Sequence, residues 1–257
     1  MTATQKPGRF VWHDLMTSDK QAAIAFYSEL VGWKTHDVDM GPMGAYTMIR
    51  VGERDIGGIV PLDPSHGVPP HFMAYCTVPD VDAAARRAEQ LGGKVGVPPT
   101  DIPGVGRFAV IADPEGAYVS PFKGNDEMPE LDGPPPFGEF CWDELTCDAP
   151  EKLLPFYKEI FGWASKPLDM GPMGTYHMLE RGDQQAGGVL EKPMPQAPTA
   201  WITYIHVQSV DDTIVKAEKL GARVLAQPMD IPDIGRFSVI ADPQGAVVAL
   251  YTSKSKS

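Results

Sequence analysis

Long hydrophobic runs are missing from this 257-residue sequence, and its first ten residues, MTATQKPGRF, lack the apolar segment of a secretory signal. Nowhere do about 18 apolar residues follow one another, as a membrane-spanning helix requires. Cysteine is also scarce, with three residues and no CxxC pair. An odd, small number of thiols argues against a disulfide framework and for a reducing compartment. We therefore expect a cytoplasmic protein without a membrane partner.

Positive charge is in short supply as well. The chain has 22 Lys and Arg against 34 Asp and Glu, a formal net charge of -12. Such a surface repels phosphate backbones, so we expect no nucleic-acid partner. With 43% apolar residues the composition is that of a globular protein. At roughly 100 to 150 residues per domain, two domains are the better expectation.

An internal repeat decides the domain organisation. Shifting the chain by 130 residues aligns FYSELVGW (26–33) with FYKEIFGW (156–163), and DMGPMG recurs at 39–44 and 169–174. A shift of 129 aligns DIPGVGRFAVIADPEGA with DIPDIGRFSVIADPQGA. The chain is therefore a tandem duplication. We expect one domain over 8–123, an acidic, Pro-rich linker over 124–136 and a second domain over 137–252.

Each copy itself divides into two similar units. In the first copy, an extended segment at 10–17 precedes a helix with Thr17, Ser18 and Asp19 as candidate caps, which Gly32 ends, and three strand-like stretches follow. The same order returns after residue 72, with Asp80 as the expected cap, and in the second copy Ser209 caps the corresponding helix. We predict an α+β fold of four βαβββ modules in two domains with half-open, curled sheets. The sequence leaves open which modules pair.

These motifs resemble the vicinal oxygen chelate superfamily, which includes glyoxalase I, extradiol dioxygenases and bleomycin resistance proteins. The resemblance rests on the FYxEhhGW helix ends (26–33 and 156–163) and on the DPxG turns (113–116 and 242–245), and it covers nearly the whole chain. It is closest to tandem, two-domain glyoxalase-like proteins. The family implies a concave sheet face that holds a divalent metal or a ligand.

Metal-using members supply His, Gln or Glu from the first and last strands of their modules. In this chain the corresponding positions carry side chains that are not ordinary metal ligands: Trp12, Met73, Ser120, Trp142, Ile202 and Ala249. A slip of one residue in the count would bring His13 or Asp143 to the first-strand position, but would not restore the others. We therefore expect no metal and no other cofactor, with a displaced divalent metal as the disfavoured alternative.

Alternation along the strands predicts which side chains share the face of the lost ligands, because residues two apart point the same way. The face is expected to be aromatic and apolar with few polar groups, as in a small-molecule pocket. The expected ligand-binding residues are Trp12, Tyr46, Met73, Tyr75, Arg107, Tyr118, Ser120, Trp142, Tyr176, Tyr204 and Arg236. The alternative for each Trp is that it fills the core. The repeated DMGPMG loops are candidates for a lid, or are tight turns.

Asp14 and Glu144 share this face and are candidate catalytic bases, together with His206. A carboxylate on a buried face is costly unless it is paired. A structural bridge to Arg107 or Arg236 is therefore an equally weighted alternative. For His206 the alternative is a satisfied structural histidine.

The leading hypothesis is a metal-independent protein that binds a small aromatic or electrophilic molecule, as a monomer or homodimer. The first alternative is an enzyme, a lyase, isomerase or dioxygenase relative with a displaced metal or with acid–base catalysis by the carboxylates. The second is a scaffold that binds a protein partner.

Overall fold

The computed structural model describes residues 7–41, 44–63, 65, 67–126, 133–171 and 174–254. Within them lie sixteen strands and four helices. In chain order they are β1 (Phe10–Thr17), α1 (Lys20–Val31), β2 (Lys34–Asp39), β3 (Ala45–Val51), β4 (Arg54–Pro61), β5 (His71–Thr77), α2 (Val81–Gln90), β6 (Lys94–Ile102), β7 (Gly106–Ala112), β8 (Tyr118–Gly124), β9 (Phe140–Cys147), α3 (Pro150–Phe161), β10 (Ala164–Asp169), β11 (Thr175–Arg181), β12 (Gln184–Glu191), β13 (Ala200–His206), α4 (Val210–Lys219), β14 (Arg223–Ile231), β15 (Gly235–Ala241) and β16 (Val247–Ser253).

This order confirms the four βαβββ modules. The Asp19 side chain accepts a hydrogen bond from the Ala22 N–H, and Gly32 ends α1 in the left-handed conformation that glycine adopts without strain. Asp80 and Ser209 cap α2 and α4 in the same way. None of the four described helices is long and apolar enough to cross a membrane.

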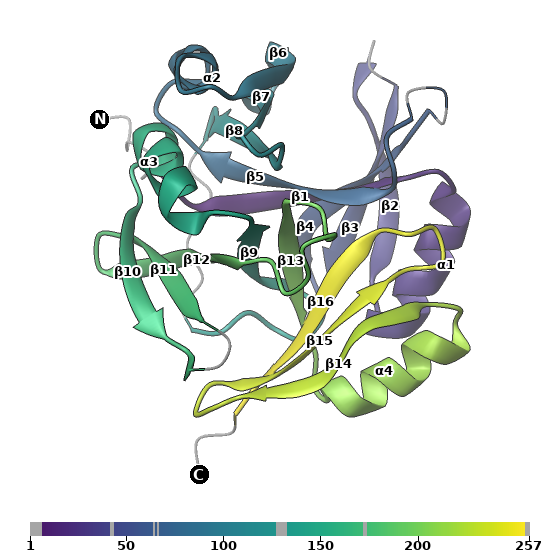
Figure 1. Cartoon of the computed structure of the whole chain (residues 1–257). Coiled ribbons are helices and arrows are strands. Elements are labelled where there is room, and N and C mark those ends of the chain that lie inside the picture. The colour runs from purple at the N-terminus through teal and green to yellow at the C-terminus, as the bar shows by residue number, and fades with distance from the viewer. Residues whose placement is uncertain are drawn as a thin grey trace. The chain divides into compact units, whose positions relative to one another are not determined.

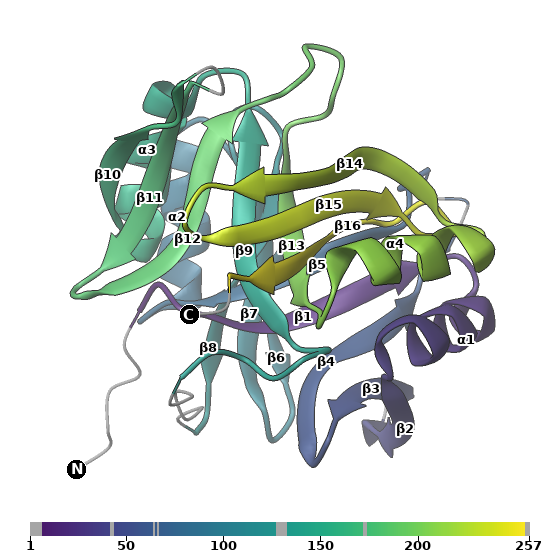
Figure 2. The ribbon, with the colours of Figure 1, turned by 90° about the horizontal axis from the view of Figure 1, so that it is seen from below.

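The strands form two eight-stranded sheets, one from each copy of the repeat. The orders are β2-β3-β4-β1-β5-β8-β7-β6 and β10-β11-β12-β9-β13-β16-β15-β14. Each sheet is curled and open, as predicted, and Figure 2 shows β14, β15 and β16 side by side with α4 against them. The predicted α+β class with half-open sheets is therefore confirmed.

The chain divides into two compact units that combine modules of different copies. Unit 1 contains the described residues of Met1–Trp12, Ala74–Glu130 and Trp142–Ile202, and unit 2 those of His13–Met73, Leu131–Cys141 and Thr203–Ser257. Unit 1 thus pairs the second module with the third, and unit 2 pairs the first with the fourth. Within unit 1, α2 packs beside α3, and within unit 2, α1 packs beside α4 (Figure 1). Each unit has its own apolar core.

The two motifs that carry the family resemblance meet inside these units. In unit 2 the Tyr27 hydroxyl donates to Asp242 of the DPxG turn at 3.2 Å. In unit 1 the Tyr157 hydroxyl donates to Asp113 at 2.7 Å. Each tyrosine and its aspartate belong to different copies of the repeat, and all four side chains are buried. The FY and DPxG motifs therefore hold the exchanged modules together.

The tryptophan of each FYxEhhGW motif acts in the same way. Trp33 donates its indole N–H to the Gly138 carbonyl in unit 2, and Trp163 donates to the Gly8 carbonyl in unit 1, both at 2.7 Å. Gly8 must be glycine, because its φ is 79° and a Cβ there would collide with the Trp163 ring. These motif residues are structural in both units.

Candidate functional site

A pair of glycines in the fourth strand of the first and third modules shapes the candidate site. Gly57 and Gly58 lie in β4, and Gly187 and Gly188 lie in β12. Gly58 is the register partner of Asp14, and Gly188 is the register partner of Glu144. A Cβ on the second glycine of either pair would collide with the hydroxyl of a tyrosine. The glycine therefore lets that tyrosine lie across the strand.

In unit 2 this tyrosine is Tyr46. Its hydroxyl donates a short hydrogen bond to Oδ1 of Asp14. Asp14 is only 5% exposed, so a partner is needed to offset the cost of burying the carboxylate. The phenol of Tyr46 is thus a hydrogen-bond partner of the Asp14 carboxylate.

In unit 1 the corresponding tyrosine, Tyr176, connects two of the other predicted residues. Its hydroxyl accepts the indole N–H of Trp142 at 2.9 Å and is hydrogen-bonded to Glu144. Burial, reinforced by the charge of Glu144, raises the pKa of Tyr176 far above its ordinary value of 10.0. The phenol therefore stays protonated and donates to the carboxylate. We call Trp142, Tyr176 and Glu144 the indole–phenol–carboxylate chain.

The indole–phenol–carboxylate chain lies on the strand face that does not pack against the helices. Leu145 and Cys147 of β9 belong to the core that contains α2 and α3. Trp142 and Glu144 alternate with them and are half-buried. A half-buried indole beside a half-buried carboxylate is within reach of a molecule in solution.

The second module contributes a second aromatic group to the same kind of face in unit 1. Tyr75 lies 6.0 Å from Phe108 and 6.2 Å from Phe122 between ring centroids. Ser120 is the register partner of Tyr75, but it is fully buried and its hydroxyl donates to the Ala109 carbonyl at 2.7 Å. The Ser120 hydroxyl therefore has a structural role and is not exposed to a ligand.

In unit 2 the fourth module provides the matching strands. Tyr204 is buried beside Phe237, with ring centroids 6.2 Å apart. Nδ1 of His206 lies 2.6 Å from the Pro135 carbonyl, while Nε2 is buried without a hydrogen-bond partner among the described residues. His206 thus anchors the segment that precedes β9. Met73 is also buried in unit 2.

Of the two alternatives for Asp14 and Glu144, the bridge to Arg107 or Arg236 is not found, because both arginines pair elsewhere. Arg107 pairs with Asp82 at 2.8 Å and with Asp101 at 2.7 Å, and Arg236 makes the equivalent pairs with Asp211 and Asp230. Each arginine pairs with an aspartate in the first turn of the preceding helix of its own module, where a negative charge is favourable. Arg107 thus connects α2 to the β6–β7 hairpin, and Arg236 connects α4 to the β14–β15 hairpin.

Two further predicted residues belong to the strands β8 and β1. Tyr118 is 49% exposed and lies beside Gly96 at the edge of the second module. Trp12 is half-buried in β1. The proposed lid falls largely on Pro42, Met43, Pro172 and Met173, which lie outside the described residues.

The described donor set does not fit the divalent metal of the superfamily. No group of three or more His, Cys, Asp or Glu side chains that could hold an ion occurs in the part of the chain that the structure describes. Ser120 and Met73, at positions where the family resemblance implies ligands, are buried and are not ordinary metal ligands, and the Asp14 and Glu144 carboxylates are hydrogen-bonded to phenols. A divalent ion needs several such ligands at one point.

Sequence reasoning missed the part played by the glycines. Gly58 and Gly188 recur at the same position of both copies, as do Tyr46 and Tyr176, and this shared recurrence was the available signal. The tyrosines were predicted on the face, but their bonds to the carboxylates depend on the register of β3, β4 and β1, which the sequence alone does not provide.

Two family models match the chain, one in each copy. The model described as "Glyoxalase/Bleomycin resistance protein/Dioxygenase superfamily" matches residues 9–120, and the model described as "Glyoxalase-like domain" matches residues 139–251. Together they span both sheets.

Curated relatives match over most of their length. "Putative glyoxylase CFP32" of Mycobacterium tuberculosis is 36% identical over 242 residues, covering 93% of this chain and 92% of that protein. "Anthracycline biosynthesis protein DnrV" of Streptomyces peucetius is 32% identical over 256 residues, covering 93% and 91%.

Solved structures share the fold at low identity. The Mn(II)-bound glyoxalase from Novosphingobium aromaticivorans has a TM-score of 0.62 at 17% identity and covers 96% of this chain and 82% of its own. The 2,2',3-trihydroxybiphenyl 1,2-dioxygenase from Sphingomonas wittichii has a TM-score of 0.63 at 13% identity, with coverages of 98% and 91%.

Proposed function

Because the chain belongs to the glyoxalase/bleomycin resistance protein/dioxygenase superfamily, we propose that it binds a small aromatic or electrophilic molecule on its strand face without a resident metal ion. The indole–phenol–carboxylate chain of unit 1 carries this proposal. It combines an aromatic surface for stacking with a fixed hydrogen-bonding group, the usual composition of a small-molecule site.

The fixed position of Tyr176 supports a binding role for the indole–phenol–carboxylate chain. Tyr176 is held by hydrogen bonds to the Trp142 N–H and to Glu144, and the absence of a Cβ at Gly188 leaves space for its hydroxyl. A preorganised polar group loses little freedom when a ligand arrives. The half-buried indole and carboxylate remain accessible from the strand face.

The aromatic class of ligand has support from one relative. DnrV is named for anthracycline biosynthesis, and anthracyclines contain planar fused rings that would stack on an indole. The net charge of -12 favours a neutral or cationic ligand over an anionic one at this site.

The test is a thermal-shift screen of EDTA-treated protein against planar aromatic molecules, beginning with an anthracycline. A ligand far above its dissociation constant is expected to raise Tm, and Trp142→Ala is expected to abolish the rise. Arg223→Gln, at an exposed strand position of unit 2, is the control. A Tm that rises only when a divalent metal is added, or equally in Trp142→Ala, would contradict the proposal.

A second function, acid–base catalysis on the bound molecule, is favoured by the two phenol–carboxylate pairs. Each combines a proton donor and an acceptor on one strand face, as such catalysis requires. The molecules found by the screen are incubated with the protein and their masses followed. Turnover that persists in the Asp14→Asn, Glu144→Gln double variant would exclude these carboxylates as catalysts.

A further inference from the structure

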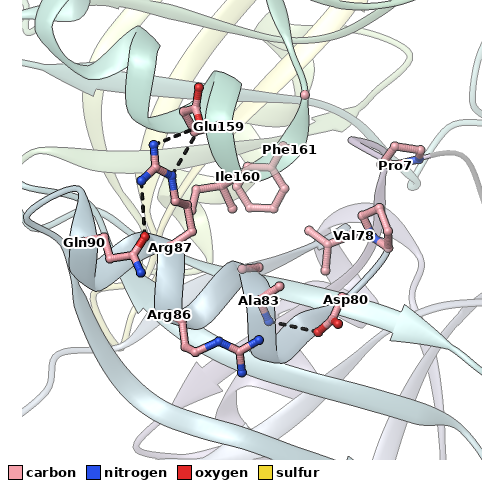
Figure 3. A pocket seen from close by; sticks show the side chains of 13 residues that line it. Pro7, Val78, Asp80, Ala83, Arg86, Arg87, Gln90, Glu159, Ile160 and Phe161 are labelled. Atoms are coloured by element: carbon pink, nitrogen blue, oxygen red, sulfur yellow. Dashed lines mark hydrogen bonds and ion pairs between the residues drawn. The ribbon is translucent and has the colours of Figure 1, made fainter.

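A groove of about 520 Å³ lies in unit 1 between α2 and the end of α3, on the helix side of the strands (Figure 3). Its floor is apolar and buried, made by Val78, Ala84, Ile160 and Phe161. Pro7 and Pro79 extend the apolar surface to one side. The volume is within the range of small-molecule sites. The described lining residues include none from the indole–phenol–carboxylate chain.

Charged side chains surround this floor, and most are already paired. Arg87 donates to Glu159 at 3.0 Å and to Gln90 at 3.2 Å. Asp80 caps α2 by accepting the Ala83 N–H at 2.9 Å. These two carboxylates therefore have partners inside the groove wall.

Arg86 is the exception at the rim. It is exposed and makes no ion pair or hydrogen bond within the described ranges, although its charge helps to lower the pKa of Asp82, which Arg107 binds directly. Figure 3 shows the Arg86 side chain extending toward the end of the groove where Ala83 and Asp80 lie, whereas Arg87 extends toward Glu159. An unpaired guanidinium beside an apolar floor is suited to an anionic group attached to an apolar body.

We propose that this groove is a second small-molecule site, which binds an apolar anion such as an aromatic or aliphatic carboxylate or sulfonate. The apolar body lies on Val78, Ile160 and Phe161, and the anionic group pairs with Arg86. The site would act independently of the strand-face site and prefers the opposite charge.

The second copy provides the matched comparison. At the positions equivalent to Arg86 and Ala83, unit 2 has Val215 and Asp212, so the cation is lost and a carboxylate is gained. Phe137 stands where unit 1 has Pro7. The equivalent surface of unit 2 is therefore not expected to bind anions, and its residues define the substitutions for the test.

The experiment measures binding of 8-anilinonaphthalene-1-sulfonate to the full-length protein by fluorescence, with N-phenyl-1-naphthylamine as the matched probe without the sulfonate. Arg86→Gln and Ala83→Asp are each expected to weaken sulfonate binding by about tenfold or more, which corresponds to about 1.4 kcal/mol. The uncharged probe should bind all variants alike. Asp at position 83 lies in the first turn of α2, where it favours the helix, so folding is preserved.

Arg223→Gln removes the same charge from an exposed position of unit 2 and is expected to leave the affinity unchanged. Amide chemical shifts then locate the probe, with the largest changes expected at Ala83, Ala84 and Gly162. Equal affinities in wild type, Arg86→Gln and Ala83→Asp would overturn the proposal. So would shifts concentrated at Trp142 and Tyr176, which would assign the probe to the strand face.

Discussion

Gly188 determines whether Tyr176 can reach Glu144, because a methyl group there would occupy the place of the phenol. We predict that Gly188→Ala destabilises unit 1 by about 1 to 3 kcal/mol, the usual cost of overpacking. In a Tyr176→Ala background the same substitution should cost almost nothing. Thermal denaturation of the four proteins measures the difference. Equal losses in both backgrounds would show that Tyr176 is not what the glycine accommodates.

Two buried tyrosines, Tyr27 and Tyr157, and the half-buried Tyr176 lead to a prediction about alkaline pH. Burial is the largest cause that raises the pKa values of Tyr27, Tyr157 and Tyr176 above 10.0. Their phenols stay protonated in the folded chain but ionise near pH 10 when unfolded, so their contribution to stability is complete below about pH 10 and is lost as pH rises further.

Ultraviolet titration of tyrosinate, followed together with circular dichroism, checks this expectation. These three phenols should ionise only as the fold is lost, and Tyr176→Phe should reduce the late-ionising set by one. Full ionisation of all tyrosines in a chain that is still folded would contradict the burial on which the candidate site rests.

At the scale of elements, the two helices that carry the FY motif begin differently. The α1 helix has its own cap, Asp19, whereas α3 begins after Ala149, which has no capping side chain. Glu115 of the second module compensates by accepting the N–H groups of Asp148 and Ala149 at 2.7 and 3.0 Å. The equivalent residue in unit 2 is Gln244, whose Oε1 is buried without a partner among the described residues.

We therefore predict that Glu115→Ala lowers the free energy of unfolding by about 1 kcal/mol, the usual value of a cap. Ala149→Asp, which copies the α1 solution, should restore most of it. Gln244→Ala should cost less than Glu115→Ala, because α1 keeps its cap. Urea denaturation measures all three. A loss on Glu115→Ala that Ala149→Asp leaves unchanged would show that capping is not the role of Glu115.

The helices were predictable because their signals are local. Asp80 and Ser209 cap through their own side chains, and Gly32 adopts a positive φ that few other residues tolerate. Alternation also placed Trp142 and Glu144 on one strand face. The partner of the carboxylate was not local: a bridge to Arg107 was one of two alternatives, but α2, the helix that follows β5, presents Asp82 to that arginine. Only the register of three strands brings Tyr176 to Glu144.

At the scale of the molecule, the pairing of modules was beyond the sequence. The two copies present nearly the same apolar faces, so periodicity does not distinguish pairing within a copy from pairing between copies. In the structure, each compact unit pairs a module of one copy with a module of the other. In this arrangement the Tyr27 hydroxyl bonds Asp242 and the Tyr157 hydroxyl bonds Asp113, each across the two copies.

Exchange between copies has a direct consequence for the linker. We predict that cutting the chain at a protease site inserted into residues 124–136 leaves the two halves associated in a 1:1 complex, because each compact unit needs residues from both. Native mass spectrometry measures this. Tyr157→Ala combined with Tyr27→Ala should promote separation. Halves that separate at once in the unsubstituted protein would contradict the exchange.

The proposed small-molecule site works without the metal ion that other members of this superfamily hold. The most direct test is the metal content per chain, by inductively coupled plasma mass spectrometry, after incubation with Fe(II), Mn(II), Ni(II) and Zn(II) and desalting. We predict far less than one ion of any metal per chain, since the described face offers indole, phenol and a paired carboxylate. One tightly held ion per chain, lost in Glu144→Gln or in a His206 variant, would contradict the account.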